Sequence, residues 1–336
     1  MTHAEHTPPE GAQRLGLDRL HAWEALGYGM FIHFGMSTFD GDELSQGDKP
    51  STLYAPDGLD VDQWIQVARD AGMRYAVLTA KHVSGHCLWP SRHTDYHVGT
   101  SGNRTDVVEA FVAACQRHGL MAGLYYCSWD NHHTLGSLTP SFAGTQSPFT
   151  TAAYREFQMA QVEELLTQYG PIGEVWIDIP VVLGGDGRRA QYDQIARLQP
   201  DAVTMMNHGI GDGSLLNLDQ AWPTDLMAIE RYLPSSHRGY NPWFTLAPSR
   251  DEARAYYIPG EVCDPIGYEW FHVEGDAPRG DAELLGMRLI CRERGVNLLL
   301  DVPPDRRGRI PRASVDALMR LRRNVEALDP PREGQS

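Results

Sequence analysis

Short apolar runs alternate along the chain with segments whose apolar residues recur at the spacing of an α-helix. The segment 105–118 is typical of the second kind, because Phe111 and Cys115 lie one helical turn apart and Gly119 follows as a stop signal. The apolar runs predict strands at 29–35, 74–81, 121–128, 174–178, 202–207, 227–230, 257–263 and 297–302. The periodic segments predict helices at 61–71, 105–118, 154–169, 190–198, 282–294 and 314–328.

Repeated strand–helix units imply parallel strands joined by right-handed crossovers. About eight such strands in one chain fit a closed barrel. The predicted fold is therefore α/β, an irregular (β/α)8 TIM-like barrel in a single domain. Between 209 and 260 the rhythm loosens and no strong helix is predicted. An open doubly wound sheet is the alternative, but it needs a glycine-rich phosphate loop after the first strand, and GMFIHFGMS (29–37) is not one.

The two ends of the chain are polar. We expect an N-terminal tail at 1–14, the barrel domain at 15–328 and a C-terminal tail at 329–336. The N-terminus lacks the apolar segment of a signal peptide, and no apolar run is long enough to span a membrane. A cytoplasmic location is therefore expected. The 5 cysteines agree with it, because no pair has the spacing of a zinc site or a redox motif.

The formal net charge of the chain is -15. A surface of that sign repels nucleic-acid phosphates and anionic lipid, so we expect no nucleic-acid partner and no membrane-surface role. A neutral substrate such as a sugar meets no such barrier, although the charge itself does not indicate one.

Polar and aromatic side chains follow the predicted strands where each strand ends. The set comprises His33, Lys81, His82, Tyr126, Trp129, Asp178, Asn207 and His208. In a parallel barrel these ends converge on one face, which is where active sites form. Asp178 closes the apolar run 175–177, where a buried carboxylate is costly without a partner or a purpose. A helix cap or a core ion pair is the structural alternative.

Glycoside hydrolysis requires two carboxyl groups that flank the glycosidic bond. Asp178 is the first candidate, and Glu230 and Glu261, in late strands or the loops after them, are candidates for the second. A surface or rim ion pair is the alternative for each glutamate. Tryptophans at strand ends and in loops offer faces on which sugar rings stack, with core packing as the alternative for each.

His82 and His86 lie four residues apart, a spacing shared by paired metal ligands. The intervening Val-Ser-Gly lacks the glutamate of the HExxH motif, and Gly85 favours a loop over the helix that the motif needs. We therefore expect no metal and no cofactor. A metal-dependent barrel hydrolase that uses His82, His86 and Asp178 remains an alternative hypothesis.

Five segments together make the sequence recognisable. They are GMFIHFGM (29–36), YAVLTAKHVSGHCLWPS (75–91), GLYYCSWD (123–130), EVWID (174–178) and NLLLDVPPDRRGRIP (297–311). From about Leu15 to Leu328 the chain resembles the α-L-fucosidases of glycoside hydrolase family 29. The resemblance implies an irregular (β/α)8 barrel and a retaining mechanism without metal, with a fucosylated oligosaccharide or glycoconjugate as the substrate.

The same resemblance implies roles for individual residues. Asp178 would be the nucleophile. The stretch 224–234 (TDLMAIERYLP) resembles the segment that supplies the acid/base and indicates Glu230, with Glu261 as the runner-up. The residues expected to bind the sugar or to lie near it are His33, Glu43, His82, His86, Tyr126, Trp129 and Trp176.

Departures from the family pattern concern the sugar more than the chemistry. Val83 and Ser84 stand where the family usually has histidine and aspartate, and His86 replaces a phenylalanine. Ile179 follows the nucleophile position, where glycine is common. Two alternatives therefore stay open: a related glycosidase for another sugar, such as an α-L-galactoside, or a catalytically silent sugar-binding barrel.

Overall fold

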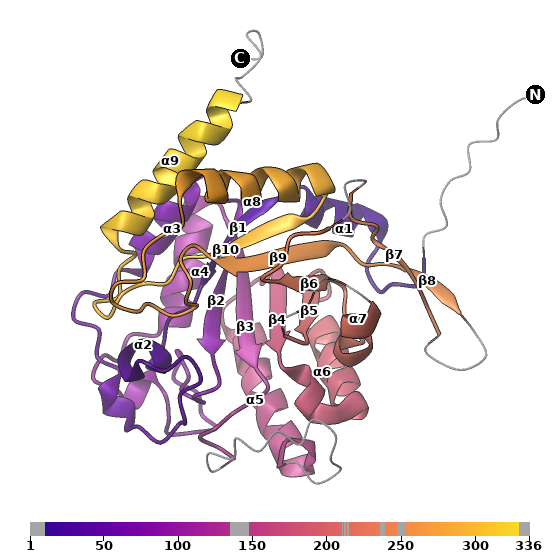
Figure 1. The fold of residues 1–336 in the computed structure, drawn as a ribbon. Helices are drawn as coiled ribbons and strands as arrows, with labels where there is room; N and C mark the ends of the chain where they lie inside the picture. Colours follow the sequence, from indigo (N-terminus) through magenta and orange to yellow (C-terminus); the bar gives the residue numbers. More distant parts are fainter. Residues whose placement is uncertain are drawn as a thin grey trace, which may run out of the picture.

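A computed structural model describes residues 11–134, 148–209, 211, 213, 215–235, 239–247 and 253–328. Its centre is an 8-stranded sheet in the order β5-β4-β3-β2-β1-β10-β9-β6, and neighbouring strands are parallel (Figure 1). The strands are β1 (Tyr28–Ile32), β2 (Tyr75–Lys81), β3 (Met121–Cys127), β4 (Glu174–Asp178), β5 (Val203–Asn207), β6 (Met227–Glu230), β9 (Gly260–Pro265) and β10 (Asn297–Asp301).

Side chains close the sheet where its two edge strands, β5 and β6, face each other. The backbone N–H of Asp225 donates to the carbonyl of Thr204 at 2.9 Å, and the N–H of Thr204 donates to Oδ2 of Asp225 at 2.9 Å. The hydroxyl of Thr224 accepts from the N–H of Met206 at 3.1 Å. The result is a nearly closed parallel barrel in one domain, which confirms the predicted fold class.

Helices surround the barrel (Figure 1). They are α1 (Leu17–Glu24), α2 (Met36–Asp40), α3 (Val61–Asp70), α4 (Val107–His118), α5 (Ala152–Gln168), α6 (Gly184–Leu198), α7 (Leu215–Ala221), α8 (Asp281–Arg294) and α9 (Arg312–Leu328). The sequence encodes their ends: the Asp106 side chain caps the N-terminus of α4, and Gly119 ends it with a φ of 72°. None of the described helices is long and apolar enough to cross a lipid bilayer.

The structure corrects the prediction in the irregular segment. The strand predicted at 257–263 is two strands, β8 (Arg254–Tyr257) and β9, and β8 pairs with β7 (Trp243–Leu246) in an antiparallel hairpin beside the barrel. The short helix α7 also lies where no strong helix was predicted. Most of the predicted N-terminal tail and all of the predicted C-terminal tail lie outside the described residues.

Side chains of the barrel strands alternate between two separate cores. On β4, Val175 and Ile177 belong to the core beneath the helices, whereas Trp176 belongs to the core that fills the barrel interior. Glu174 and Asp178 have the same parity as Trp176. One strand therefore sends three inward side chains to successive levels of the barrel.

Candidate active site

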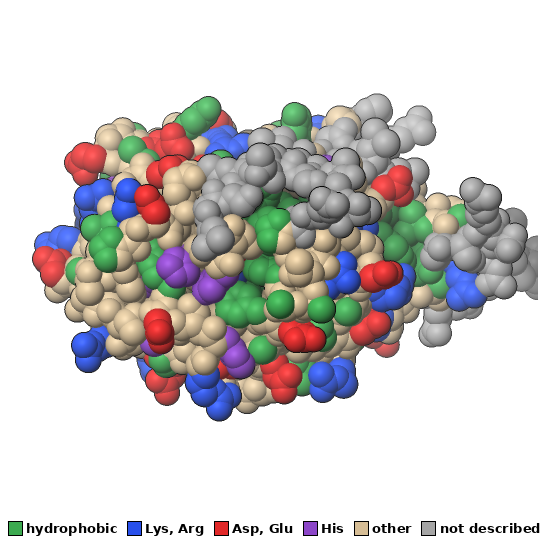
Figure 2. All heavy atoms as spheres, turned by 90° about the horizontal axis from the view of Figure 1, so that it is seen from below, with side chains coloured by type: hydrophobic (Ala, Val, Ile, Leu, Met, Phe, Trp, Pro, Cys, Tyr) green, Lys and Arg blue, Asp and Glu red, His purple; other side chains and the backbone are tan. Residues whose placement is uncertain are grey.

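A pocket opens at the carboxyl ends of the barrel strands. Figure 2 views the molecule from this end, where apolar side chains and histidines gather near the middle and charged side chains surround them. The pocket is lined by Phe31, His33, Glu43, His82, Tyr125, Trp176, Asp178, Asn207, Glu230, Cys263 and Trp270. Six of the predicted site residues are in this set: Asp178, Glu230, His33, Glu43, His82 and Trp176.

Asn207, the last residue of β5, joins two carboxyl groups. Its amide nitrogen donates to Oδ1 of Asp178 at 2.8 Å and to Oε2 of Glu230 at 2.9 Å. The N–H of Gly209 donates to the amide oxygen of Asn207 at 3.1 Å, which fixes the orientation of the amide. Because both carboxyl oxygens touch one nitrogen, their separation cannot greatly exceed the spacing of about 5–5.5 Å found in retaining glycosidases.

Asp178 ends β4 in a half-buried position. Tyr125 of β3 donates its hydroxyl to Oδ2 at 2.6 Å, and Asn207 satisfies Oδ1. Burial raises the pKa of Asp178 above its ordinary value, while these two hydrogen bonds act in the opposite direction by stabilising the carboxylate. The site thus holds a partly desolvated carboxylate with its oxygens oriented by neutral donors.

Glu230 ends β6 in a different environment. Burial raises its pKa to about 7, and the negative charge of Asp178 adds to the effect. The hydrogen bond from Asn207 and the positive charge of Arg231 oppose the rise. Glu230 accepts one of these neutral side-chain hydrogen bonds and Asp178 accepts two, so Glu230 is the better suited to hold a proton near neutral pH.

The backbone turns sharply after each of these carboxyl residues. Ile179 has a φ of 48° and Arg231 a φ of 59°, and among the described residues they are the two that are not glycine and have a positive φ. A β-branched residue in this left-handed region is an outlier that costs of order 1–3 kcal/mol. Such strain persists where the surrounding structure holds the chain in place.

Two histidines form one wall of the pocket. Nδ1 of His33 lies 2.9 Å from Oδ1 of Asp301, which also accepts from the His33 backbone N–H at 3.1 Å. In the tautomer in which Nδ1 donates to Asp301, Nε2 of His33 is an acceptor that faces the pocket. The His82 ring stacks on Tyr125 with centroids 5.7 Å apart. Burial lowers the pKa of His33 to about 3 and that of His82 well below its ordinary value, so both rings are neutral.

Glu43 reaches the pocket from a loop that later segments hold in place. Asn131 donates its amide to the carbonyl of Ser45 at 2.9 Å, and the His132 ring lies 2.7 Å from the carbonyl of Gly47. Burial raises the pKa of Glu43. The loop after β3 therefore determines where the first-loop glutamate stands.

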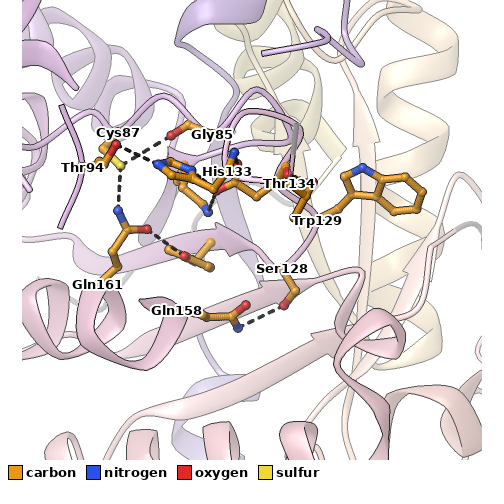
Figure 3. A network of polar contacts seen from close by, with 12 residues as sticks. Gly85, Cys87, Thr94, Ser128, Trp129, His133, Thr134, Gln158 and Gln161 are labelled. Carbon is orange, nitrogen blue, oxygen red and sulfur yellow. Dashed lines mark hydrogen bonds and ion pairs between the residues drawn. The ribbon is translucent and has the colours of Figure 1, made fainter. Parts of the chain in front are cut away.

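The loop after β3 is itself anchored by a buried ion pair. Lys81 and Asp130 are both completely buried and form a salt bridge, and the His133 ring also contacts Asp130 at 2.7 Å. Figure 3 shows His133 beside Thr94, with Nε2 of His133 and the threonine hydroxyl 2.7 Å apart.

The helix α5 completes the same polar network. Gln158 donates to the Ser128 hydroxyl at 3.1 Å, and Gln161 donates to Sγ of Cys87 at 3.3 Å (Figure 3). Lys81, which the sequence places at a strand end, thus serves the framework and does not line the pocket.

Four predicted site residues do not line this pocket. Tyr126 points away from the barrel interior and donates to Gln161 of α5 at 2.8 Å. Trp129 packs against Phe149 and donates to Asn131. His86 lies against Tyr54 and 2.9 Å from the Ser101 hydroxyl. These three residues lie outside the pocket for the same reason: each side chain faces a loop or a helix outside the strand ends.

Glu261 is the fourth of these residues. It lies at the start of β9, with its side chain completely buried deep in the barrel interior. Its carboxyl accepts from Tyr75 at 2.6 Å and from the Trp176 indole at 2.9 Å. Asn207 therefore links the carboxyl of Asp178 to that of Glu230, and not to that of Glu261.

Several pocket residues were not singled out from the sequence. Tyr125, Cys263 and Phe31 line the pocket, and Asp301 supports it from behind. Asp301 closes the last strand, so the strand-end criterion that found Asp178 would also have found it. Trp270, one of the tryptophans that the sequence places in loops or at strand ends, lies in the loop after β9, and its ring is 5.1 Å from that of His33.

The pocket offers carboxyl groups and neutral rings. Within the described parts of the chain, no group of three or more His, Cys, Asp or Glu side chains has the geometry of a metal site. His82 lines the pocket and His86 does not, so the proposed trio of His82, His86 and Asp178 is not assembled.

A parallel barrel with two linked carboxyl groups at its carboxyl-terminal face has the arrangement that glycoside hydrolysis requires. The family model for α-L-fucosidase matches residues 47–326. The chain therefore belongs to the α-L-fucosidase family.

Individual relatives agree with this assignment. Alpha-L-fucosidase 1 of Arabidopsis thaliana is 31% identical over 314 residues, covering 88% of this chain and 57% of the relative. Alpha-L-fucosidase of Dictyostelium discoideum is 25% identical over 268 residues, covering 78% of this chain and 53% of the relative. The chain thus spans about half the length of these curated relatives.

Solved structures share the fold. Alpha-L-fucosidase isoenzyme 1 from Paenibacillus thiaminolyticus aligns with a TM-score of 0.74 at 25% identity, covering 92% of this chain and 75% of that one. Alpha-L-fucosidase AlfC from Lactobacillus casei, in complex with α-L-fucose, aligns with a TM-score of 0.73 at 20% identity, covering 93% and 99%. The second likeness concerns the fold alone.

Proposed function

We propose that the protein is a retaining exo-glycosidase that releases terminal α-L-fucose from oligosaccharides or glycoconjugates. Family membership supports the sugar. The observation that supports the mechanism is the shared contact of Asp178 and Glu230 with Asn207, which holds one carboxyl close to the other. That arrangement suits a nucleophile and an acid/base on opposite sides of an anomeric carbon.

In the proposed first step, ionised Asp178 attacks the anomeric carbon while protonated Glu230 donates its proton to the departing oxygen. A covalent fucosyl–Asp178 ester forms and the aglycone leaves. In the second step, Glu230, now a carboxylate, removes a proton from water, and that water cleaves the ester with net retention. The raised pKa of Glu230 supports its first role, and its loss of a proton supports its second.

The neutral wall of the pocket suits a sugar. His33, held by Asp301, presents Nε2 as an acceptor for a hydroxyl, and His82 and Glu43 line the same pocket. Trp176 and Trp270 add apolar faces on which the C–H face and methyl group of a deoxy sugar can pack. A related glycosidase for α-L-galactosides would need room for an additional hydroxyl at the same position.

A panel of aryl glycosides tests the sugar and the chemistry together. We expect the wild-type protein to hydrolyse aryl α-L-fucoside and Asp178→Asn to lose at least about 10³-fold in kcat with the fold retained. Preference for the α-L-galactoside would favour the alternative sugar. Tight binding of fucose without hydrolysis of any member of the panel would favour the silent sugar-binding barrel and overturn the proposal.

A second experiment assigns the acid/base. For Glu230→Ala, azide should restore turnover of an activated aryl fucoside by attacking the fucosyl ester in place of water. The product should be a fucosyl azide with the same anomeric configuration as the substrate. Glu261→Ala serves as the matched variant, and azide should not rescue it. Rescue of Glu261→Ala instead of Glu230→Ala would move the acid/base to Glu261.

A further inference from the structure

Two glutamates lie together in the barrel interior, below the pocket. Glu174 is the first residue of β4 and Glu261 the second residue of β9, and both side chains are 0% exposed. The two strands are not neighbours in the sheet, so the side chains meet across the lumen and not along a ladder. Neither residue lines the pocket, and the proposed mechanism uses neither of them.

Neutral groups donate hydrogen bonds to this pair. The Trp176 indole N–H is shared between Oε1 of Glu174 and Oε2 of Glu261, at 2.9 Å from each. Trp23 of α1 donates to the other oxygen of Glu174 at 2.9 Å, and Tyr75 donates to the other oxygen of Glu261 at 2.6 Å. Within the described chain, neither glutamate forms an ion pair with a basic side chain.

Two bare carboxylates in such a place would repel each other with no cation to compensate them. The loss of solvation disfavours each charge, and a second charge at hydrogen-bonding distance adds to the penalty. Burial accordingly raises the pKa of Glu174 well above its ordinary value, and burial likewise raises that of Glu261. A single proton held between them removes the repulsion and leaves one charge for the three donors to stabilise.

We propose that Glu174 and Glu261 share one proton as a carboxylic acid–carboxylate pair, and that this pair positions Trp176 beneath the pocket. An indole N–H held by two acceptors cannot rotate without losing both. The Trp176 ring lies 5.1 Å from Phe31 and stacks on Tyr125 at 6.2 Å, and all three rings line the pocket.

The pair is thereby connected to the carboxyl at the strand end. Trp176 supports Tyr125, and Tyr125 donates to Asp178 at 2.6 Å. Glu174 and Glu261 are positioning residues that act through Trp176. The effect on turnover rests on the proposed function, whereas the shared proton and the indole hydrogen bond do not.

The shared proton is tested by infrared difference spectroscopy at neutral pH. The wild-type spectrum minus that of Glu174→Gln, and minus that of Glu261→Gln, should each contain the carbonyl band of a protonated carboxylic acid. Each glutamine replaces the proton-bearing partner by an amide that donates to the remaining carboxylate. Absence of the band from both difference spectra would overturn proton sharing, whether or not the protein hydrolyses fucosides.

The positioning role is tested with Glu261→Gln, Glu261→Ala and a matched control. Glu164 of α5 also accepts an indole hydrogen bond, from Trp89 at 2.9 Å, but outside the barrel interior. We expect Glu261→Gln to keep kcat/KM within about threefold of wild type and Glu261→Ala to lower it about tenfold or more, while Glu164→Ala leaves it unchanged.

The indole resonance of Trp176 gives a readout that does not depend on activity. The resonance is identified in nitrogen–proton correlation spectra by its loss in Trp176→Phe. It should shift strongly in Glu261→Ala, weakly in Glu261→Gln and not at all in Glu164→Ala. An unmoved indole resonance in Glu261→Ala would overturn the positioning role even if no fucosidase activity were found. Where Glu261→Ala does not fold, Glu174→Ala removes the other acceptor of the same indole N–H and should shift the resonance strongly, and an unmoved resonance there would overturn the positioning role.

Discussion

The amide nitrogen of Asn207 lies 2.8 Å from Oδ1 of Asp178. The same amide nitrogen donates to Glu230 at 2.9 Å, so one neutral side chain bridges two carboxyl groups that would otherwise repel each other. Proper separation of the two proposed catalytic groups thus depends on a third residue that does no chemistry itself.

Asn207→Asp tests this dependence without changing the size of the side chain. A third carboxyl would remove the donor from both neighbours and raise the pKa of Asp178 and Glu230 further, leaving less of the ionised nucleophile. We expect kcat/KM for an aryl fucoside to fall about 100-fold or more. A kcat/KM within threefold of wild type, equivalent to roughly 0.65 kcal/mol of transition-state stabilisation, would show that the bridge is dispensable.

Two adjacent tyrosines on β3 provide a matched pair of variants. Tyr125 donates to Asp178, whereas Tyr126 donates to Gln161 on the opposite face of the strand. Tyr125→Phe should lower kcat/KM about 10–100-fold, because a hydrogen bond to a charged group is lost. Tyr126→Phe should lower the free energy of unfolding by about 1 kcal/mol and leave kcat/KM near wild type. The opposite pattern would mean that the strand faces are assigned the wrong way round.

The pH profile of kcat/KM should be bell-shaped. Activity requires ionised Asp178, whose pKa burial raises above its usual value, so the acidic limb should lie higher than for an exposed aspartate. Activity also requires protonated Glu230, so it should fall as the pH rises above about 7. In Glu230→Gln the high-pH limb should vanish for a substrate whose leaving group needs no acid. Persistence of that limb would assign it to another group.

The same carboxyl predicts a pH-dependent change in stability. The folded pKa of Glu230 lies above the unfolded value, so the folded state binds the extra proton and the protein loses stability as the pH rises through about 7. Glu230→Gln removes this loss and should raise the free energy of unfolding by about 1–3 kcal/mol at alkaline pH. At a pH below the pKa of Glu230 in the unfolded chain, the free energy of unfolding of Glu230→Gln should not exceed that of wild type. An equal increase at all pH values would contradict the explanation.

The buried pair of Lys81 and Asp130 should matter for folding more than for chemistry. Lys81→Met leaves Asp130 charged and buried without its cation, and we expect a loss of about 3–5 kcal/mol in denaturant unfolding. Arg320→Ala removes a partner from the exposed pair with Asp281 and is the matched control, with a loss below about 1 kcal/mol. Equal losses would indicate that burial does not distinguish the two pairs.

The barrel and the strand that carries Asp178 could be predicted because both follow local patterns. Apolar runs mark the strands, and Asp178 and Glu230 each end one of them. The choice between Tyr125 and Tyr126 could not be made in this way, because both occur in a strand that is apolar on both faces. It depends on register, in which Tyr125 pairs with Trp176 and so shares its inward direction.

The position of Glu261 shows how a small error in a strand boundary alters a functional hypothesis. The predicted strand at 257–263 puts Glu261 near its carboxyl end, on the pocket face. The actual strand, Gly260–Pro265, puts the residue near its beginning, at the opposite end of the lumen. The error arose because the prediction did not include the hairpin β7–β8. Tyr257 is the last residue of β8, which is a separate strand.

The left-handed residues Ile179 and Arg231 have a consequence for redesign of the protein. Each directly follows a carboxyl-bearing strand, Ile179 before the short 3-10 helix Pro180–Leu183 and Arg231 before a loop, and each has a dihedral angle that few residues tolerate. A loop transplanted from another family member would carry the native geometry across only if its first residue accepted a positive φ. Glycine or asparagine at these two junctions is therefore the natural starting point for grafting new substrate-recognition loops onto an unaltered catalytic barrel.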